Sequence, residues 1–345
     1  MLRMSWRGHI VPKLAVLAAG VCAFIAAPIH ARAQPALEDV VITLPAFSLT
    51  VSAGYIADDL GLWEKQGLRV KKITLQGIAA TNAVIAGSSD FAEGSGVSFT
   101  RAAARGQRLL AIVNTIDRPF VQIVLRNDLA AAAGFDPKAS LEKRARVLRG
   151  RTIAVESINS VVHGYVRLIA KRGGYDPEEI RISPMQPDNM IAAFQTKAID
   201  GFAMSLPWPQ KPVLEGTATV IASGPDGDPP EMKPFAYNLV VTRPETCIKR
   251  KPLCEKVGHA YAEAIAFIMD QPEKALALLE KRFSMLDPKL VAASFAAIRK
   301  ITPRPPVVSR AALENAELFD IEAGLLKPED KLKSYDGLYT DEFAK

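Results

Sequence analysis

The stretch NAVIAGSSDFAEGSGVS, Asn82 to Ser98, decides the fold class of this chain. Its Ala-rich start is expected to be a helix that stops at Gly87, because glycine readily adopts the left-handed conformation that ends helices. A short strand, Asp90 to Ala92, then leads into a small polar loop, Glu93 to Ser98. Open α/β sheets bind ligands at loops that follow the carboxyl ends of their strands. The stretch therefore predicts an α/β fold with a ligand site at this loop.

The same pattern returns 110 residues later in AFQTKAIDGFAMSLPW, Ala193 to Trp208. Asp90 corresponds to Asp200 in the two copies, and Ser95 corresponds to Ser205. The paired aspartates stand at strand starts, away from the expected cleft, and we interpret them as turn or capping residues. The repeat predicts two α/β lobes that each offer one loop to a shared cleft.

The first 33 residues have the three parts of a secretory signal peptide. Arg3, Arg7 and Lys13 form a basic start, residues 14–27 are apolar, and Ala31-Arg32-Ala33 is an A-x-A cleavage site. A membrane anchor is disfavoured because the apolar run is shorter than the roughly 20 residues that a spanning helix needs. We expect Sec-type export to the periplasm, a mature chain that starts near Gln34, and no membrane insertion after cleavage.

Removal of this leader changes the charge and the supply of metal ligands. The remainder has 39 Lys and Arg against 37 Asp and Glu, a net charge of +2 in place of +6. Such a surface gives no electrostatic reason to expect nucleic acid or anionic lipid as a partner. His163, His259, Cys247 and Cys254 remain, too few and too scattered for a Cys/His metal site.

Cys247 and Cys254 enclose six residues. In an oxidising compartment this spacing favours a disulfide, and the alternative is two buried thiols.

Motifs of catalysis and cofactor binding are missing from the sequence. It has no P-loop, no GxSxG elbow and no HExxH pair, and Gly94-x-Gly96 lacks the third glycine of a dinucleotide fingerprint because Phe99 stands there. We therefore expect a protein that is not an enzyme and that carries no cofactor.

Two apolar strands are candidates for segments that cross between the lobes, Val121 to Leu125 and Tyr237 to Thr242. They divide the chain into a first lobe of residues 34–125 and 240–345 and a second lobe of residues 126–239. The 312 residues that follow the leader are enough for two lobes with cores of their own.

Three features of the expected cleft point to ligand contacts. Glu93 could accept a ligand amine or amide, and its alternative is a solvated loop carboxylate. A helix that starts at Ser160 and Val161, straight after the strand Thr152 to Val155, presents free N–H groups to a polar or anionic ligand, or is capped without one. Trp208 could stack on a ligand or simply pack in the core.

The chain resembles the solute-binding proteins of ABC importers in the nitrate/sulfonate/taurine and thiamine-pyrimidine group. The resemblance covers almost the whole chain after the leader and rests on several short motifs. These are Gly61-Leu62-Trp63-x-x-x-Gly67-Leu68, Ala83-x-x-x-Gly87-x-x-Asp90-Phe91, Ala102-Ala103-x-x-x-Gly106, Leu148-x-Gly150-x-x-Ile153-Ala154-Val155, Asp200-Gly201 and Tyr335-Asp336-Gly337-Leu338-Tyr339. They are typical of the superfamily, and none is specific for a ligand.

The resemblance implies a two-lobed type II periplasmic-binding-protein fold, with mixed sheets flanked by helices and a hinge of two crossing segments. It implies a monomer that captures a small organic or oxyanionic solute, such as a sulfonate, taurine, nitrate or a pyrimidine, and delivers it to a membrane permease with cytoplasmic ATPase subunits. The implied ligand-binding residues, combined with those above, are Phe47, Ser48, Glu93, Ser95, Gly96, Asn159, Ser160, Val161, His163 and Trp208.

The predicted cleft loops contain no basic side chain, so an oxyanion would depend mainly on helix N–H groups. Glu93 favours a ligand with a hydrogen-bond donor, such as a heterocycle or an amine-bearing sulfonate. Two other functions remain open. One is a sensory protein that presents a ligand to a receptor, and the other is an enzyme of thiamine-pyrimidine synthesis, which the leader and the scarcity of histidine disfavour.

Overall fold

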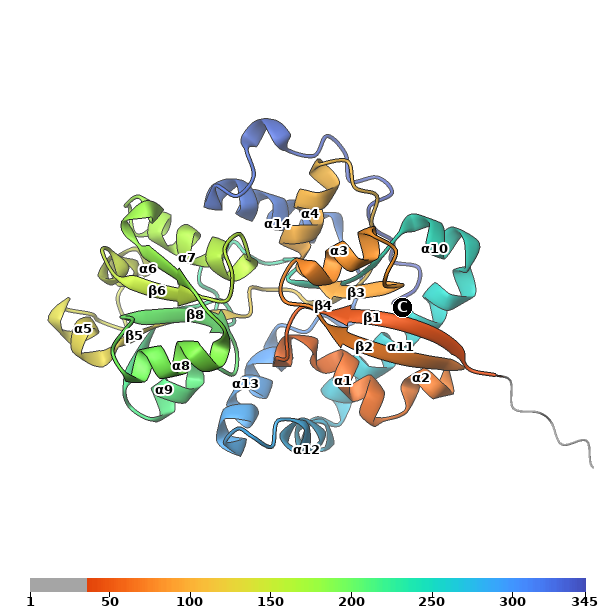
Figure 1. Ribbon diagram of the computed structural model, residues 1–345, viewed down its shortest axis with the longest axis horizontal. Coiled ribbons are helices and arrows are strands. Elements are labelled where there is room, and N and C mark those ends of the chain that lie inside the picture. The colour runs from red at the N-terminus through yellow and green to blue at the C-terminus, as the bar shows by residue number, and fades with distance from the viewer. Residues whose placement is uncertain (1–35) are drawn as a thin grey trace, which may run out of the picture. The chain divides into compact units, whose positions relative to one another are not determined.

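The computed structural model describes residues 36–345, so the predicted leader lies outside the described residues. Two five-stranded sheets form the frame of this part of the chain (Figure 1). The first sheet contains β1 (Glu38–Leu44), β2 (Leu68–Thr74), β3 (Phe91–Gly94), β4 (Leu110–Ile116) and β10 (Asn238–Thr242). The second sheet contains β5 (Val121–Arg126), β6 (Thr152–Val155), β7 (Arg181–Pro184), β8 (Gly201–Ser205) and β9 (Ala218–Ser223).

The two sheets have the same topology. Their strand orders are β2-β1-β3-β10-β4 and β7-β6-β8-β5-β9. In each sheet the first three strands are parallel, and the fourth runs antiparallel to both of its neighbours. The repeat seen in the sequence is therefore a repeat of whole half-sheets, and the expectation of mixed sheets is confirmed.

The chain crosses between the sheets twice. Residues 117–120 lead from β4 to β5, and residues 224–237 lead from β9 to β10. The strand that follows each crossing takes the antiparallel place in the sheet it enters. The segment expected to form the first crossing, Val121 to Leu125, is thus already a strand of the second sheet, which begins before the lobe boundary drawn at residue 126.

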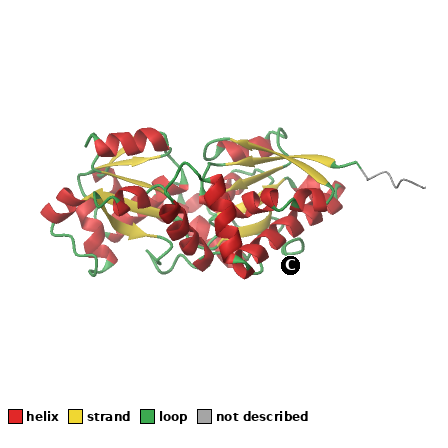
Figure 2. Ribbon diagram, turned by 90° about the horizontal axis from the view of Figure 1, so that it is seen from below, coloured by secondary structure: helices red, strands yellow, loops and turns green. Residues whose placement is uncertain are grey.

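Helices cover both faces of each sheet (Figure 2). Those that follow strands of the first sheet, or form the C-terminal region, are α1 (Ser52–Asp59), α2 (Leu62–Lys65), α3 (Ala79–Ile85), α4 (Gly96–Ala104), α10 (Pro244–Lys249), α11 (Lys251–Asp270), α12 (Pro272–Arg282), α13 (Pro288–Lys300) and α14 (Arg310–Ala323). Those of the second lobe are α5 (Asn127–Ala132), α6 (Leu141–Ala145), α7 (Val161–Arg172), α8 (Pro187–Gln195) and α9 (Gln210–Leu214). Within residues 36–345, no helix has the length and apolar character needed to cross a bilayer.

Asp90 and Asp200 make equivalent hydrogen bonds in the two lobes. The Asp90 carboxylate accepts the Val41 N–H at 2.9 Å, and the Asp200 carboxylate accepts the Thr152 N–H at 2.8 Å. Each bond ties the turn before the third parallel strand to the central strand of that set. The structural role predicted for these two carboxylates is confirmed.

Helix α14 packs against helices of both lobes. It lies beside α4 and α7 (Figure 1), and its Phe319 ring occupies the space that a side chain at Gly164 of α7 would need, 2.7 Å from an ideal Cβ. The Arg101 guanidinium of α4 lies 3.2 Å from the Asp320 carboxylate of α14, and both side chains are buried.

The expected disulfide is present between Cys247 of α10 and Cys254 of α11. It joins two consecutive helices of the first lobe.

Candidate ligand-binding site

A cavity of about 50 Å³ is lined by residues of both lobes. The first lobe contributes Pro45, Ala46, Ser48, Thr50, Gly77, Ile78, Ser95 and Ser98. The second lobe contributes Glu156, Ser160, Val161, Met204 and Ser205, and the end of the second crossing contributes Tyr237 and Asn238. Sites for drug-sized ligands measure about 300–1,000 Å³. This cavity suits a small solute or one polar end of a larger one.

The cavity lies where the parallel strands of both sheets end. The loop after β1 supplies Ser48, the end of β3 supplies Ser95, the end of β6 supplies Glu156, and Ser205 is the last residue of β8. Carboxyl ends of parallel strands meet at one edge of an α/β sheet, which is the edge that binds ligands in this fold class.

Two helix N-termini reach this cavity, α4 and α7, and their first residues differ in how they are used. Ser160 caps α7, because its Oγ accepts the His163 N–H at 3.1 Å and donates to the Ser157 carbonyl at 2.9 Å. Ser95 precedes α4 but makes no capping bond through its side chain. The Ser95 hydroxyl is thus free to bind a ligand, whereas the Ser160 hydroxyl is engaged by its own helix.

Close approach of the second crossing to α4 requires glycine at position 96. An ideal Cβ on Gly96 would lie 2.1 Å from the Ala236 carbonyl oxygen, which accepts the Gly96 N–H at 3.1 Å. This contact holds Tyr237 and Asn238 against the start of the helix and so shapes one wall of the cavity.

Buried hydroxyls in the cavity wall have no partner within the described residues. The Oγ1 of Thr50, a side chain that is 8% exposed, and the Oγ of Ser95 make no hydrogen bond there. Buried polar groups in native proteins are nearly always paired. These two hydroxyls therefore mark positions where a bound solute can complete the bonding.

Glu156 is the charged side chain among the residues that line the cavity. It is half-buried, and within residues 36–345 it makes no hydrogen bond or ion pair. Burial raises the pKa of Glu156 from 4.5 to about 7, because desolvation penalises the carboxylate. Tyr237 lies nearby and is engaged with Ser205 through their hydroxyls at 2.9 Å.

The structure brings four of the predicted site residues to the cavity wall: Ser48, Ser95, Ser160 and Val161. Gly96 begins α4 beside them. The other five predicted site residues do not line the cavity: Phe47, Glu93, Asn159, His163 and Trp208.

Glu93 lies in the core of the first lobe because β3 extends through Gly94, so residue 93 belongs to the strand and not to the loop. Its carboxylate is fully buried and accepts hydrogen bonds from the Tyr261 hydroxyl at 2.9 Å and the Asn238 amide at 2.7 Å. Burial raises the pKa of Glu93 to about 7, although the nearby Lys72 ammonium opposes this effect. The geometry gives Glu93 contact with the cavity only through Asn238.

Phe47, Trp208 and His163 pack within their own lobes, whereas the Asn159 carbonyl accepts a hydrogen bond across the lobes from Arg101 of α4 at 2.9 Å. The centroids of the Phe47 and Phe283 rings are 4.6 Å apart. Trp208 packs against an apolar cluster of the second lobe that includes Met204. His163 is buried in α7, where its Nδ1 accepts the Asn159 N–H at 3.1 Å, and burial lowers the pKa of its imidazole.

Sequence reasoning missed Glu156, Tyr237 and Asn238. Glu156 directly follows the strand Thr152 to Val155, which was predicted with its correct bounds, and the rule applied to Glu93 would have selected it. Tyr237 and Asn238 could have been found only with knowledge that the second crossing passes the start of α4.

Within residues 36–345, no group of three or more His, Cys, Asp or Glu side chains is placed to hold a metal ion.

Comparison with known proteins gives a family and a shared fold. The family model described as "NMT1/THI5 like" matches residues 50–275. No curated protein sequence matches the chain. A solved protein from Bordetella bronchiseptica RB50 shares 15% identity with a TM-score of 0.72, and the alignment covers 89% of this chain and 95% of that one.

Two further structures carry descriptive names. The alkanesulfonate-binding protein SsuA from Xanthomonas axonopodis pv. citri, bound to MOPS, shares 18% identity with a TM-score of 0.66 over 85% of this chain and 96% of that one. The periplasmic nitrate-binding protein NrtA from Synechocystis PCC 6803 shares 16% identity with a TM-score of 0.60 over 75% and 70%. These likenesses confirm the predicted two-lobed periplasmic-binding-protein fold.

Proposed function

Because this chain belongs to the NMT1/THI5-like family, we propose that it is the solute-binding component of an ABC importer. In this proposal the protein captures a small solute between its lobes and performs no chemistry on it. The observation that carries the proposal is the cavity itself, which both lobes line and whose Thr50 and Ser95 hydroxyls have no partner in the described chain.

The proposal includes a hinge, a location and a partner. The lobes, which are built on the first sheet (β1 to β4 with β10) and on the second sheet (β5 to β9), close on the solute by bending at the two crossings, residues 117–120 and 224–237. The leader directs the chain to the periplasm, where it acts as a monomer, and the closed form delivers its solute to a membrane permease with cytoplasmic ATPase subunits. The family resemblance and the names of the structural neighbours support sulfonates, taurine, nitrate and pyrimidines as the solutes to test first.

A thermal-shift screen of the purified protein tests the binding function. The panel contains nitrate, ethanesulfonate, taurine and 4-amino-5-hydroxymethyl-2-methylpyrimidine. A solute present at 100 times its Kd stabilises the folded state by about 2.7 kcal/mol and raises the Tm accordingly.

The matched variants place an indole either inside or outside the cavity. Ala46→Trp fills the cavity at a half-exposed position of its wall and should abolish the shift. Ala132→Trp, on an exposed face of α5, should preserve it. The proposal fails if neither this panel nor an extract of small metabolites shifts the Tm, or if Ala46→Trp binds as the unchanged protein does.

A further inference from the structure

The charge of the cavity wall is opposite to what the oxyanion ligands of the structural neighbours would require. Glu156 brings a carboxylate to the wall, and the lining residues include no Lys, Arg or His. Above about pH 7, where Glu156 is ionised, a sulfonate or nitrate at the wall would meet this carboxylate. Arg101, which lines a neighbouring pocket that shares Ile78 and Ser160 with the cavity, is already paired with Asp320. Two negative charges that come close together in a partly desolvated site repel each other strongly.

The carboxylate is unpaired within the described chain. The Tyr237 hydroxyl, which lies near Glu156, is engaged with Ser205 at 2.9 Å, and burial without a hydrogen-bond or ion-pair partner is the cause of the raised Glu156 pKa. A carboxylate that has lost part of its water contact and has no protein partner is unfavourable. A bound solute with an N–H donor would remove that penalty.

Groups on the facing wall complement a different part of the solute. The first N–H of α4, on Gly96, already donates to the Ala236 carbonyl, but the Thr50 and Ser95 hydroxyls have no partner within the described chain. These groups can bind an acceptor atom of the solute. The cavity thus offers donors on the first lobe and an acceptor, Glu156, on the second.

We propose that Glu156 determines the specificity of this cavity by accepting a hydrogen bond from a nitrogen of the solute, so that the protein takes a small amine or amino-substituted heterocycle and discriminates against oxyanions that lack a donor. The inference rests on the proposed solute-binding function. It names one shared chemistry, an N–H group beside an acceptor group, that an aliphatic ammonium compound or an aminoheterocycle can supply.

Matched solute pairs, measured by isothermal titration calorimetry at a pH well above the Glu156 pKa of about 7, test this assignment. Taurine is compared with ethanesulfonate, which lacks the amine, and 4-aminopyrimidine is compared with pyrimidine. In at least one pair the member with an amino N–H donor should bind at least tenfold more tightly, since a hydrogen bond to a charged group contributes roughly 1.5–3 kcal/mol. The pair that shows the difference identifies whether the source is an ammonium compound or a heterocycle.

Glu156→Gln then tests whether the negative charge of the acceptor matters, because the Gln carbonyl oxygen can still accept a hydrogen bond. The amide has nearly the same shape but no negative charge, so the preferred solute should lose at least tenfold in affinity, while ethanesulfonate and nitrate should bind equally or more tightly. Glu215→Gln, an exposed carboxylate of the same lobe, should leave all affinities unchanged.

The inference is overturned if ethanesulfonate, pyrimidine or nitrate binds as tightly as the preferred amino-bearing solute, or if Glu156→Gln leaves the affinity for that solute unchanged. In that case solute binding itself stands. Absence of binding by every probe overturns the inference as well, and the metabolite-extract screen then decides whether the proposed function falls with it.

Discussion

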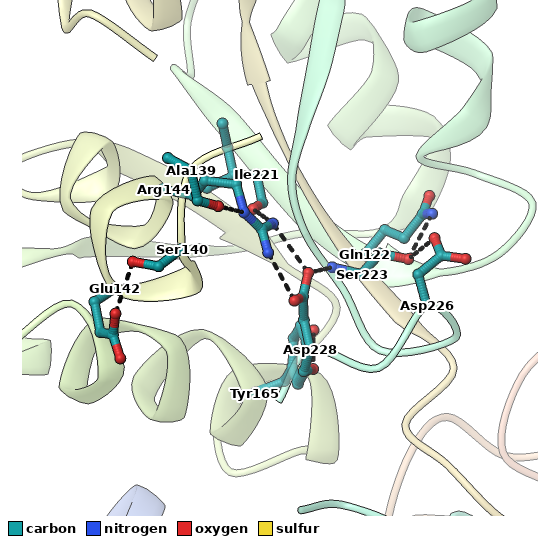
Figure 3. Close-up of polar contacts among 10 residues, drawn as sticks. All are labelled: Gln122, Ala139, Ser140, Glu142, Arg144, Tyr165, Ile221, Ser223, Asp226 and Asp228. Atoms are coloured by element: carbon teal, nitrogen blue, oxygen red, sulfur yellow. Dashed lines mark hydrogen bonds and ion pairs between the residues drawn. The ribbon is translucent and has the colours of Figure 1, made fainter. Parts of the chain in front are cut away.

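Arg144 and Asp228 form a bidentate ion pair, with Nη1 3.0 Å from Oδ2 and Nη2 2.7 Å from Oδ1 (Figure 3). Each side chain is 16% exposed. Asp228 also accepts the Ser223 N–H at 2.9 Å, and the Tyr165 hydroxyl donates to its carbonyl at 2.6 Å. The second crossing is thereby fastened to the second lobe, nine residues before it supplies Tyr237 to the cavity.

Replacement of Arg144 should destabilise the protein. Arg144→Met leaves the Asp228 carboxylate largely buried without its cation, and loss of one partner of a buried ion pair costs about 3 kcal/mol. The free energy of unfolding, measured in urea, should fall by that amount. Arg149→Met removes an exposed pair with Glu179 and should cost less than about 1 kcal/mol. Equal losses in the two variants would contradict the importance of this anchor.

The Ser160 hydroxyl should contribute to stability and the Ser95 hydroxyl to solute binding. Ser160→Ala removes the cap of α7 and should lower the free energy of unfolding by about 1 kcal/mol. Ser95→Ala removes no capping bond and should change stability by no more than about 0.5 kcal/mol, but it should weaken solute binding. Chemical denaturation together with calorimetry separates the two effects, and a large stability loss in Ser95→Ala would show that its hydroxyl is structural.

The free energy of unfolding of the solute-free protein should depend on pH through the Glu156 carboxyl. Its folded-state pKa, about 7, lies above the unfolded value of 4.5, so the native state binds more protons than the unfolded state between these values. The contribution of Glu156 to the free energy of unfolding therefore declines as pH rises from about 4.5 to about 7 and is constant above that.

The comparison that isolates this effect is between Glu156→Gln and the unchanged protein at each pH, because Glu93 titrates in the same window and His163 acts in the opposite direction. Urea denaturation should show the variant gaining stability relative to the unchanged protein between pH 5 and pH 7.5. A difference that stays constant over this range would mean that the carboxylate is not desolvated.

Removal of the disulfide should affect stability without affecting binding. The bond closes a short loop between Cys247 and Cys254, for which loop entropy predicts a contribution of roughly 2 kcal/mol. Cys247→Ser combined with Cys254→Ser should lower the free energy of unfolding by that amount, and a reductant should do the same to the unchanged protein but nothing to the variant. Loss of solute affinity in the variant would contradict its separation from the cavity.

Features set by neighbouring residues could be predicted from the sequence. Helix α7 begins as expected, because its Ser160 cap is a local signal. Its end at Arg172, directly before Gly173, follows a local signal of the same kind. The matching roles of Asp90 and Asp200 were likewise visible as a repeat.

Features set by distant pairing could not be predicted. Glu93 lies within β3 because that strand pairs with β10, where Glu93 stands opposite Val240. The place of β5 in the second sheet depends on strands β8 and β9, which come much later in the chain. The cavity wall is formed by both lobes and the second crossing together, so the sequence predicts only some of the residues that line it.

The position of α14 limits how this protein can open. The helix packs on α4 and on α7, and Arg167 of α7 donates to the Ala323 carbonyl at 2.6 Å while Arg101 of α4 pairs with Asp320. Any rotation that separates the lobes must break the contacts of α14 with α4 or with α7, or shift the helix along both. If the lobes open as proposed, the C-terminal helix therefore resists that motion, and the ease of solute entry depends on the contacts that α14 makes with both lobes.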